Sequence, residues 1–180
     1  MKSKTRNIKG RLGLAVFLIA FLLGNQMTYG QSGYYGSMTF YIWHIAKNVE
    51  WPADYKSGDF IIGVLGKSDA TQQFKMMAMK RDLGGRSIKV AEYSTVDEIA
   101  KCNMLFVSKN FSGQLSDVLK KINGASIMTL TEEEGLALKG SCANFIPQGA
   151  RVAGVEMNRA AMDKAGLKAS KELAKWMVVP

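Results

Sequence analysis

Side chains that could act as a nucleophile, a base or a metal ligand are scarce in this sequence. It has one histidine, His44, and two cysteines, Cys102 and Cys142, in 180 residues. Hydrolytic and redox enzymes need a nucleophile, a base that activates it and a group that orients the base. His44 does not lie on the apolar face that the helical periodicity of its segment predicts. The two cysteines lack the spacing of thioredoxin-like and zinc sites. We therefore expect no enzyme activity, no metal site and no cofactor.

The two cysteines could pair with each other. Each stands just before an expected strand, and parallel strands start along the same edge of a sheet, so the sulfurs could meet if those strands are neighbours. Cys102 and Cys142 are therefore a candidate disulfide, which an oxidising compartment would favour. The alternative is two small buried thiols, a common state of free cysteine.

A glycine-containing turn offers a candidate ligand site. Gly63 and Gly66 are followed by Lys67, Ser68 and Asp69, where an apolar strand gives way to a helix. In open α/β sheets, ligands bind beyond the carboxyl ends of strands, and the amides at a helix N-terminus can bind an anion. Gly66, Ser68 and Asp69 are thus candidate ligand-binding residues. The spacing matches neither phosphate-loop fingerprint, and a tight turn with ordinary helix caps is the simpler interpretation.

Two further features invite a functional interpretation. The acidic run Glu132–Glu134 follows Thr131 and is typical of the solvated first turn of a helix, where carboxylates complement the helix dipole. Trp51 stands before Pro52 at the end of a helical segment, a position suited to an interface anchor, since tryptophan is enriched at interfaces. Burial of Trp51 against a sheet is the alternative.

The elements that must position these residues alternate between strands and helices. This alternation predicts a single α/β domain with a mainly parallel sheet, flanked by helices and closed by a C-terminal β-hairpin. Capping-box patterns, Thr95 with Glu98 and Thr131 with Glu134, predict two further short helices. The expected strands span residues 60–65, 88–91, 104–107, 126–130, 143–146 and 152–157, and the main helices span 37–49, 69–80, 112–122, 158–166 and 170–177.

The first 30 residues have the layout of a secretory signal peptide. Five basic residues precede an apolar run from Leu12 to Leu23, and small residues follow, ending at Gly30. The run is shorter than the ~20 residues of a membrane-spanning helix, which makes an uncleaved anchor the weaker alternative. Residues 31–180 would then form the exported domain, with 19 basic and 15 acidic residues and a net charge of +4. Such a small charge gives no support to nucleic-acid binding.

An ordered series of short blocks resembles a known family. The blocks are Asn48-Val49-Glu50-Trp51-Pro52, the strand from Phe60 to Gly66, Gly85-Arg86-Ser87-Ile88, Cys102-Asn103-Met104-Leu105-Phe106-Val107-Ser108, Thr129-Leu130-Thr131 with Gly135, Asn144-Phe145-Ile146, Val155-Glu156-Met157-Asn158 and Ala165-Gly166-Leu167-Lys168-Ala169-Ser170. Their order and spacing resemble the YfiR-like family of exported bacterial proteins over nearly the whole domain.

The resemblance implies a periplasmic α/β domain without known catalytic activity. The best-understood members are dimeric repressors that bind the periplasmic region of a membrane-bound YfiN-type diguanylate cyclase and respond to the redox state of their cysteines. That type carries two disulfides, whereas this chain has two cysteines in all. Phe145 and Glu156 match the stretch that supports partner contact in the family, and together with Trp51 they are our candidate partner-binding residues. The alternative function is a periplasmic domain that binds a small molecule beside Gly66, Ser68 and Asp69.

Overall fold

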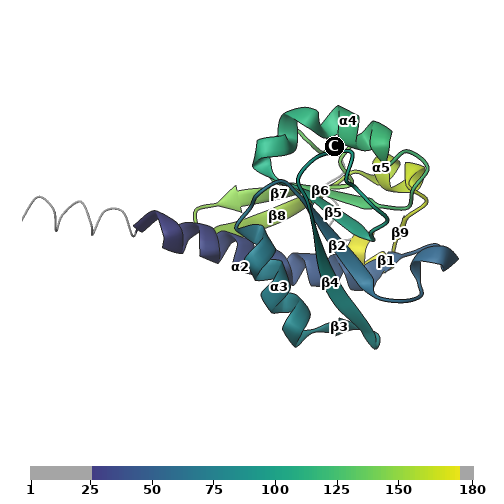
Figure 1. The fold of residues 1–180 in the computed structure, drawn as a ribbon, viewed down its shortest axis with the longest axis horizontal. Coiled ribbons are helices and arrows are strands. Elements are labelled where there is room, and N and C mark those ends of the chain that lie inside the picture. Colours follow the sequence, from purple (N-terminus) through teal and green to yellow (C-terminus); the bar gives the residue numbers. More distant parts are fainter. Residues whose placement is uncertain (1–25, 175–180) are drawn as a thin grey trace, which may run out of the picture.

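A seven-stranded sheet lies at the centre of the computed structural model, which describes residues 26–174 (Figure 1). The strand order is β3-β4-β2-β5-β6-β7-β8, and a small second sheet pairs β1 with β9. The helices are α2 (Gln26–Asn48), α3 (Ala70–Lys80), α4 (Leu115–Lys121), α5 (Arg159–Lys164) and α6 (Lys171–Ala174), with 3₁₀ turns η1 (Ala53–Tyr55) and η2 (Lys109–Gln114). The strands are β1 (Val49–Glu50), β2 (Phe60–Leu65), β3 (Asp82–Leu83), β4 (Arg86–Tyr93), β5 (Met104–Val107), β6 (Met128–Thr131), β7 (Ala143–Gln148), β8 (Arg151–Met157) and β9 (Lys168–Ala169).

The sheet is mixed. Strands β4, β2, β5, β6 and β7 pair in parallel, whereas β3 and β8 pair antiparallel to β4 and β7 at the two edges. The α/β class is confirmed, but the mainly parallel sheet of the sequence analysis is corrected to a mixed one. The reason is local: Gly84 and Gly85, both with positive φ, form a tight turn that folds β3 back on β4.

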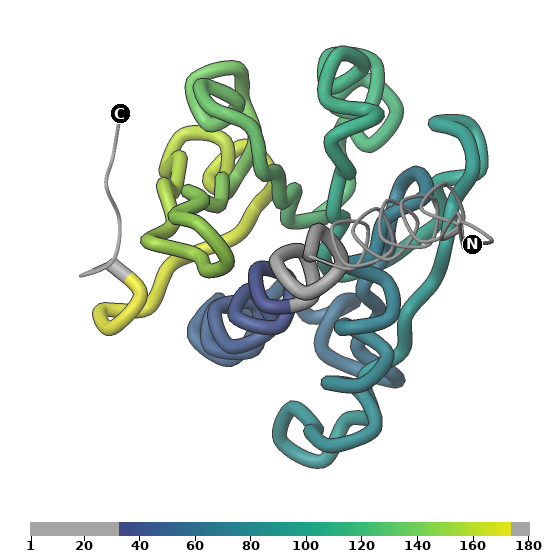
Figure 2. The backbone as a smooth tube through the Cα atoms, turned by 90° about the vertical axis from the view of Figure 1, so that its left-hand side faces the viewer, coloured from purple at the N-terminus to yellow at the C-terminus, as the bar shows by residue number. Residues whose placement is uncertain are grey.

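Helices cover both faces of the sheet. Figure 1 shows α4 on one side, with α2 and α3 on the other. The buried side of α2 carries Met38, Ile42 and Ile45, none of which is exposed. Figure 2, in which α2 is seen nearly end-on, shows this helix lying between α3 and the C-terminal part of the chain, and its contacts with α3, β8 and α6 agree. The predicted helix over 37–49 is therefore real and begins at least eleven residues earlier.

The predicted signal peptide falls mostly outside the described residues. Residues 1–25 are not described, and the predicted cleavage point after Gly30 lies within α2. Within residues 26–174, none of the helices combines the length and the apolar character that crossing a membrane requires.

Two expected short helices are absent from the structure. Residues 94–100 form turns, in which the Glu98 carboxylate accepts the Ser94 amide at 2.7 Å. The segment after Thr131 also forms turns. A capping-box pattern specifies how a helix starts but not whether enough residues follow to sustain it, since short helices depend on tertiary packing. By contrast, the predicted cap at Asn158 is confirmed, because its Oδ1 accepts the Ala161 amide at 2.9 Å.

The order of the strands reverses beside β2. The chain passes from β2 through α3 to β4 on one side, and then returns to place β5 on the other side of β2. This is a topological switch point, where the loops that follow two neighbouring parallel strands diverge to opposite faces and leave a crevice between them.

Candidate functional site

A crevice of about 210 Å³ opens at this switch point. It lies at the carboxyl ends of β2, β5 and β6, with one wall from α2. Its lining residues are Tyr35, Lys67, Ser68, Asp69, Ser108, Lys109, Asn110 and Glu132. Polar and charged side chains therefore dominate a hollow that sits where α/β sheets bind ligands.

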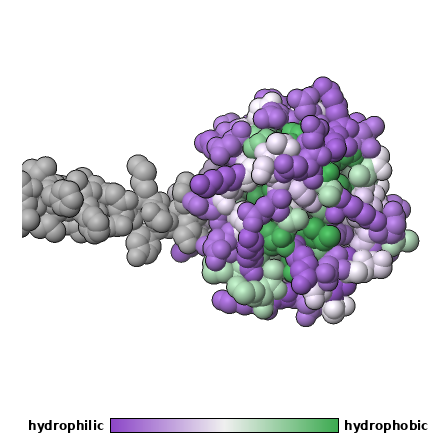
Figure 3. All heavy atoms as spheres, in the orientation of Figure 1, coloured by the Kyte–Doolittle hydropathy of each residue, from purple (hydrophilic) through white to green (hydrophobic). Residues whose placement is uncertain are grey.

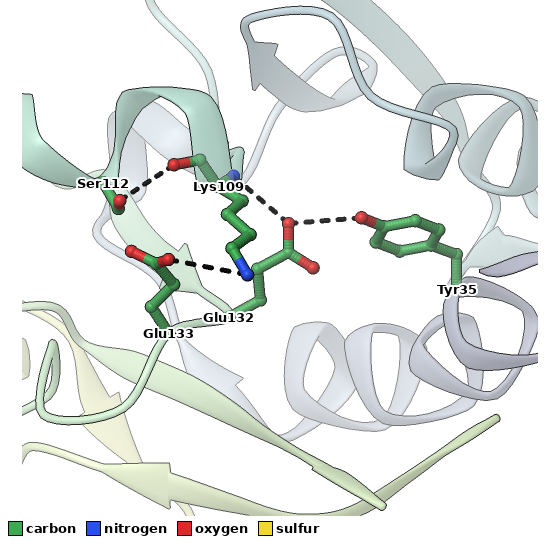
Figure 4. A network of polar contacts seen from close by, with 5 residues as sticks. All are labelled: Tyr35, Lys109, Ser112, Glu132 and Glu133. Carbon is green, nitrogen blue, oxygen red and sulfur yellow. Dashed lines mark hydrogen bonds and ion pairs between the residues drawn. The ribbon is translucent and has the colours of Figure 1, made fainter. Parts of the chain in front are cut away.

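Glu132 is the central charged group of the crevice (Figure 4). Its Oε1 accepts the Lys109 amide at 3.2 Å and the Tyr35 hydroxyl at 3.3 Å. Burial raises the pKa of the Glu132 carboxyl, while the bonds from Lys109 and Tyr35 oppose that shift. Burial, aided by the nearby Glu132 charge, likewise raises the pKa of Tyr35 to about 12. A carboxylate held partly out of water in this way is available to a ligand that can donate hydrogen bonds to it.

Two buried hydroxyl groups around Glu132 have no partner. Among the described residues, the Tyr34 hydroxyl and the Ser108 Oγ are the buried side-chain polar atoms that lack a hydrogen bond. Ser108 is itself 2% exposed and lines the crevice, and Tyr34 lies near enough to Glu132 for that carboxylate to help burial raise the pKa of its phenol. Buried polar groups are normally paired, so each of these hydroxyls has unused capacity for a hydrogen bond.

The backbone after β2 is shaped to form this crevice. Gly66 has φ +85°, and a Cβ placed there would lie 2.5 Å from Ser108 Oγ and from the Phe111 ring. Ser68 Oγ accepts the Ala70 amide at 3.2 Å at the start of α3, and Asp69 makes no capping bond. The structure thus brings Ser68 and Asp69 into the lining and sets Gly66 directly beside Ser108. Ligand binding by these three residues stays a prediction.

The candidate partner-binding residues lie mainly in the core. Trp51 is 7% exposed, packs edge-on to Phe60 at 5.3 Å and donates from Nε1 to the Ala46 carbonyl. Phe145 on β7 is fully buried, and Glu156 on β8 is half-buried and accepts a bond from Asn144 at 3.3 Å. Glu156 alone among the three is partly exposed, and burial in the core, which was the alternative for Trp51 and Phe145, describes both aromatic residues. Partner binding by these three residues stays a prediction.

Cys102 and Cys142 are free, buried thiols, which corrects the candidate disulfide. They precede β5 and β7, and β6 lies between these strands. Neighbouring strands are ~4.8 Å apart, so residues two strands apart are separated by roughly 10 Å, whereas bonded cysteines have Cα atoms within about 7 Å. Burial raises the pKa of Cys102 to about 12 and also raises the pKa of Cys142.

The sequence analysis missed most of the crevice. Glu132 was interpreted as part of a solvated helix start, and neither Tyr35 nor Ser108 was considered. A signal did exist for Glu132 and Ser108, because both directly follow strands that were expected to be parallel and therefore end at the same edge. Tyr35 carries no such signal, since its position depends on how α2 packs against the sheet.

Comparison with known proteins decides the family. The profile of the YfiR/HmsC-like family matches residues 38–176, more than half of the chain. The chain belongs to the YfiR/HmsC-like family. The resemblance seen in the sequence is thereby confirmed. No curated protein matches this chain.

Seven chains of solved structures are similar in fold. One is described as an ABC domain in complex with L-Trp from Streptococcus pneumonia, with 11% sequence identity and a TM-score of 0.51. The match covers 67% of this chain and 54% of the other, so our chain spans about half the length of that structure. At this identity the likeness shows the fold alone.

Membership narrows the functional class. YfiR/HmsC-like proteins form a periplasmic family that is regulatory rather than catalytic, and membership is consistent with regulation of cyclic-di-GMP signalling.

Proposed function

We propose that this protein is a periplasmic regulator that binds the periplasmic region of a membrane-bound signalling protein and represses it. The partner is a YfiN-type diguanylate cyclase or a similar sensor. The observation that carries this proposal is the family match over residues 38–176. The scarcity of nucleophiles and bases in the sequence agrees with a role in binding.

The surface around Glu156 is our proposed contact with the partner. Asn144 and Glu156 are paired residues on β7 and β8, and Phe145 lies next to Asn144 in the same strand. Phe145 and Trp51 are buried, and they support this surface indirectly, because they hold the strands and the end of α2 in place. On the face drawn in Figure 3, hydrophilic residues cover much of the surface, and hydrophobic residues gather near its middle.

Photo-crosslinking in intact cells tests this proposal. A photoreactive residue is placed at Glu156 in the full chain with its own leader, and the matched control carries it at Lys89, an exposed position on β4. We expect position 156 to capture a membrane protein with a cyclase output, and deletion of the chain to raise cellular cyclic-di-GMP. Capture from both positions alike, or of nothing but a second copy of the chain, would contradict the proposed contact, and the second result would support a homodimer instead.

The crevice favours a second function, the binding of a small molecule. The observation behind it is the polar hollow at the switch point with two unpartnered hydroxyls beside Glu132. The similar structure from Streptococcus pneumonia is described as a complex with L-Trp, so a related fold can hold a small ligand. A ligand that binds the folded state raises the melting temperature by mass action, and a thermal-shift screen of metabolites measures this. Such a ligand could also shift the affinity for the membrane partner.

A further inference from the structure

Two oxygens that line the crevice can each accept a further hydrogen bond. Glu132 Oε1 already receives two bonds, whereas none of the described residues donates to Oε2. Figure 4 shows this second oxygen turned away from both bonds. Ser108 Oγ, which lines the crevice and has no partner among the described residues, is a further oxygen that can accept a bond.

The protein does not fill this position with a cation of its own. The Lys109 ammonium lies 3.9 Å from Glu133, and its side chain is 73% exposed. Its charge lowers the pKa of Glu132, but burial has the larger effect. Lys67 is exposed at the rim, and Asp69 adds a second carboxylate there. Among the described residues, the partly buried carboxylate of Glu132 therefore forms no direct ion pair, although burial makes such a charge costly to leave unpaired.

Aromatic rings stand beside the same carboxylate. Tyr34 and Tyr35 have ring centroids 5.1 Å apart, and Tyr35 lines the crevice. Tyr35 approaches Glu132 through its hydroxyl, and its ring adds an aromatic group to the lining. An ammonium group has three N–H donors and no acceptor, which fits the acceptor oxygens Glu132 Oε2 and Ser108 Oγ.

We propose that the crevice binds the ammonium group of a small primary amine, with Glu132 as its counter-ion and Ser108 Oγ as a further acceptor. This inference rests on the crevice being a ligand site, the second function proposed above. The volume of about 210 Å³ limits the ligand to a small molecule, below the usual size of drug-binding pockets.

Titration followed by amide NMR tests the proposal with simple probes. The full chain is titrated with n-butylammonium chloride, and in parallel with n-butanol and sodium n-butyrate at constant ionic strength. We expect a saturable shift of the Ser108 and Lys109 amides with the ammonium probe alone. Glu132→Gln should weaken this binding about tenfold or more, since a buried charged hydrogen bond is lost. The matched control, Glu134→Gln, changes the same charge at an exposed position of the same run and should leave binding unchanged.

A second variant, Ser108→Ala, keeps the proposal testable if Glu132→Gln fails to fold. Ser108→Ala removes a hydroxyl that bonds to none of residues 26–174, so the fold should tolerate it. Binding of n-butylammonium should nevertheless weaken several-fold, which a merely structural serine would not cause.

Each other outcome has a definite meaning. Saturable binding of butyrate or butanol in place of butylammonium would keep the crevice as a ligand site and overturn the ammonium proposal. An absence of shifts at Ser108 and Lys109 with every probe would overturn the ammonium proposal as well, and a thermal-shift screen without a hit would then remove the ligand site itself. Equal weakening by Glu134→Gln would show diffuse charge attraction, and it too would contradict the proposed role of Glu132.

Discussion

At the scale of single residues, Glu132 combines burial with negative charge. Its pKa is raised in the folded state, mainly by desolvation, with Tyr34, Tyr35, Lys109 and Glu133 as the titratable groups around it. A carboxyl group with a raised pKa holds its proton more tightly in the folded than in the unfolded state. Its contribution to stability is therefore greatest at low pH and falls as the pH rises through the interval between the unfolded and folded pKa values.

We predict that Glu132→Gln stabilises the protein at neutral pH. The amide keeps an oxygen for the Lys109 and Tyr35 donors and removes the buried charge. Thermal unfolding should show a higher melting temperature for the variant at pH 7, and the difference should shrink below roughly pH 4, where the carboxyl group is protonated in both states. Glu134→Gln serves as the control and should change little. A variant destabilised equally at both pH values would contradict the prediction.

The cysteines give a second prediction at this scale. At pH 8 the Cys102 thiol, with a pKa of about 12, is almost wholly protonated, and both cysteines are buried. We expect a thiol reagent to label the native protein very slowly and to label two thiols per chain once denaturant unfolds it. Fewer than two thiols in unfolded, unreduced protein would show that a disulfide forms despite the intervening strand.

At the scale of elements, the turn from β2 to α3 makes the crevice. Gly66→Ala should destabilise the protein by ~1–3 kcal/mol, because φ +85° is costly for alanine and the new methyl group meets Ser108 and Phe111. Gly113→Ala is the matched control, since open space surrounds that position in η2. Urea unfolding of both variants measures the difference. Equal stability of the two variants would show that the turn can relax at little cost.

At the scale of the whole molecule, core residues and contact residues must be told apart. Phe145→Ala should lower stability by ~3–5 kcal/mol, because it removes a fully buried ring. Loss of partner capture by this variant should therefore follow loss of folded protein. Glu156→Gln should leave the unfolding free energy within about 1 kcal/mol and still weaken capture of the partner, with Lys89→Gln as the control. Unchanged capture by Glu156→Gln, at full stability, would place the contact elsewhere.

Local patterns predicted most of the elements. The apolar runs at 60–65 and 104–107 are strands β2 and β5, and the segment after Asp69 is α3. The C-terminal hairpin is confirmed, but it turns at Gly149 and Ala150, because Pro147 and Gln148 still pair with β8. Hydrophobic periodicity and turn residues act between near neighbours, so they can be interpreted without the fold. Capping boxes failed at Thr95 and Thr131, because a favourable first turn does not ensure a helix without packing partners.

The sequence by itself determined the α/β class, the family, the rarity of groups that could catalyse a reaction, and the turn between a strand and a helix at Gly66, Ser68 and Asp69. Only the tertiary structure decided which strands are neighbours. That order separates Cys102 from Cys142 by one strand, and it brings Tyr35, Ser108 and Glu132 to one crevice from three distant parts of the chain. The physical reason is that strand order and helix docking are settled by long-range packing of the core, which no local pattern encodes.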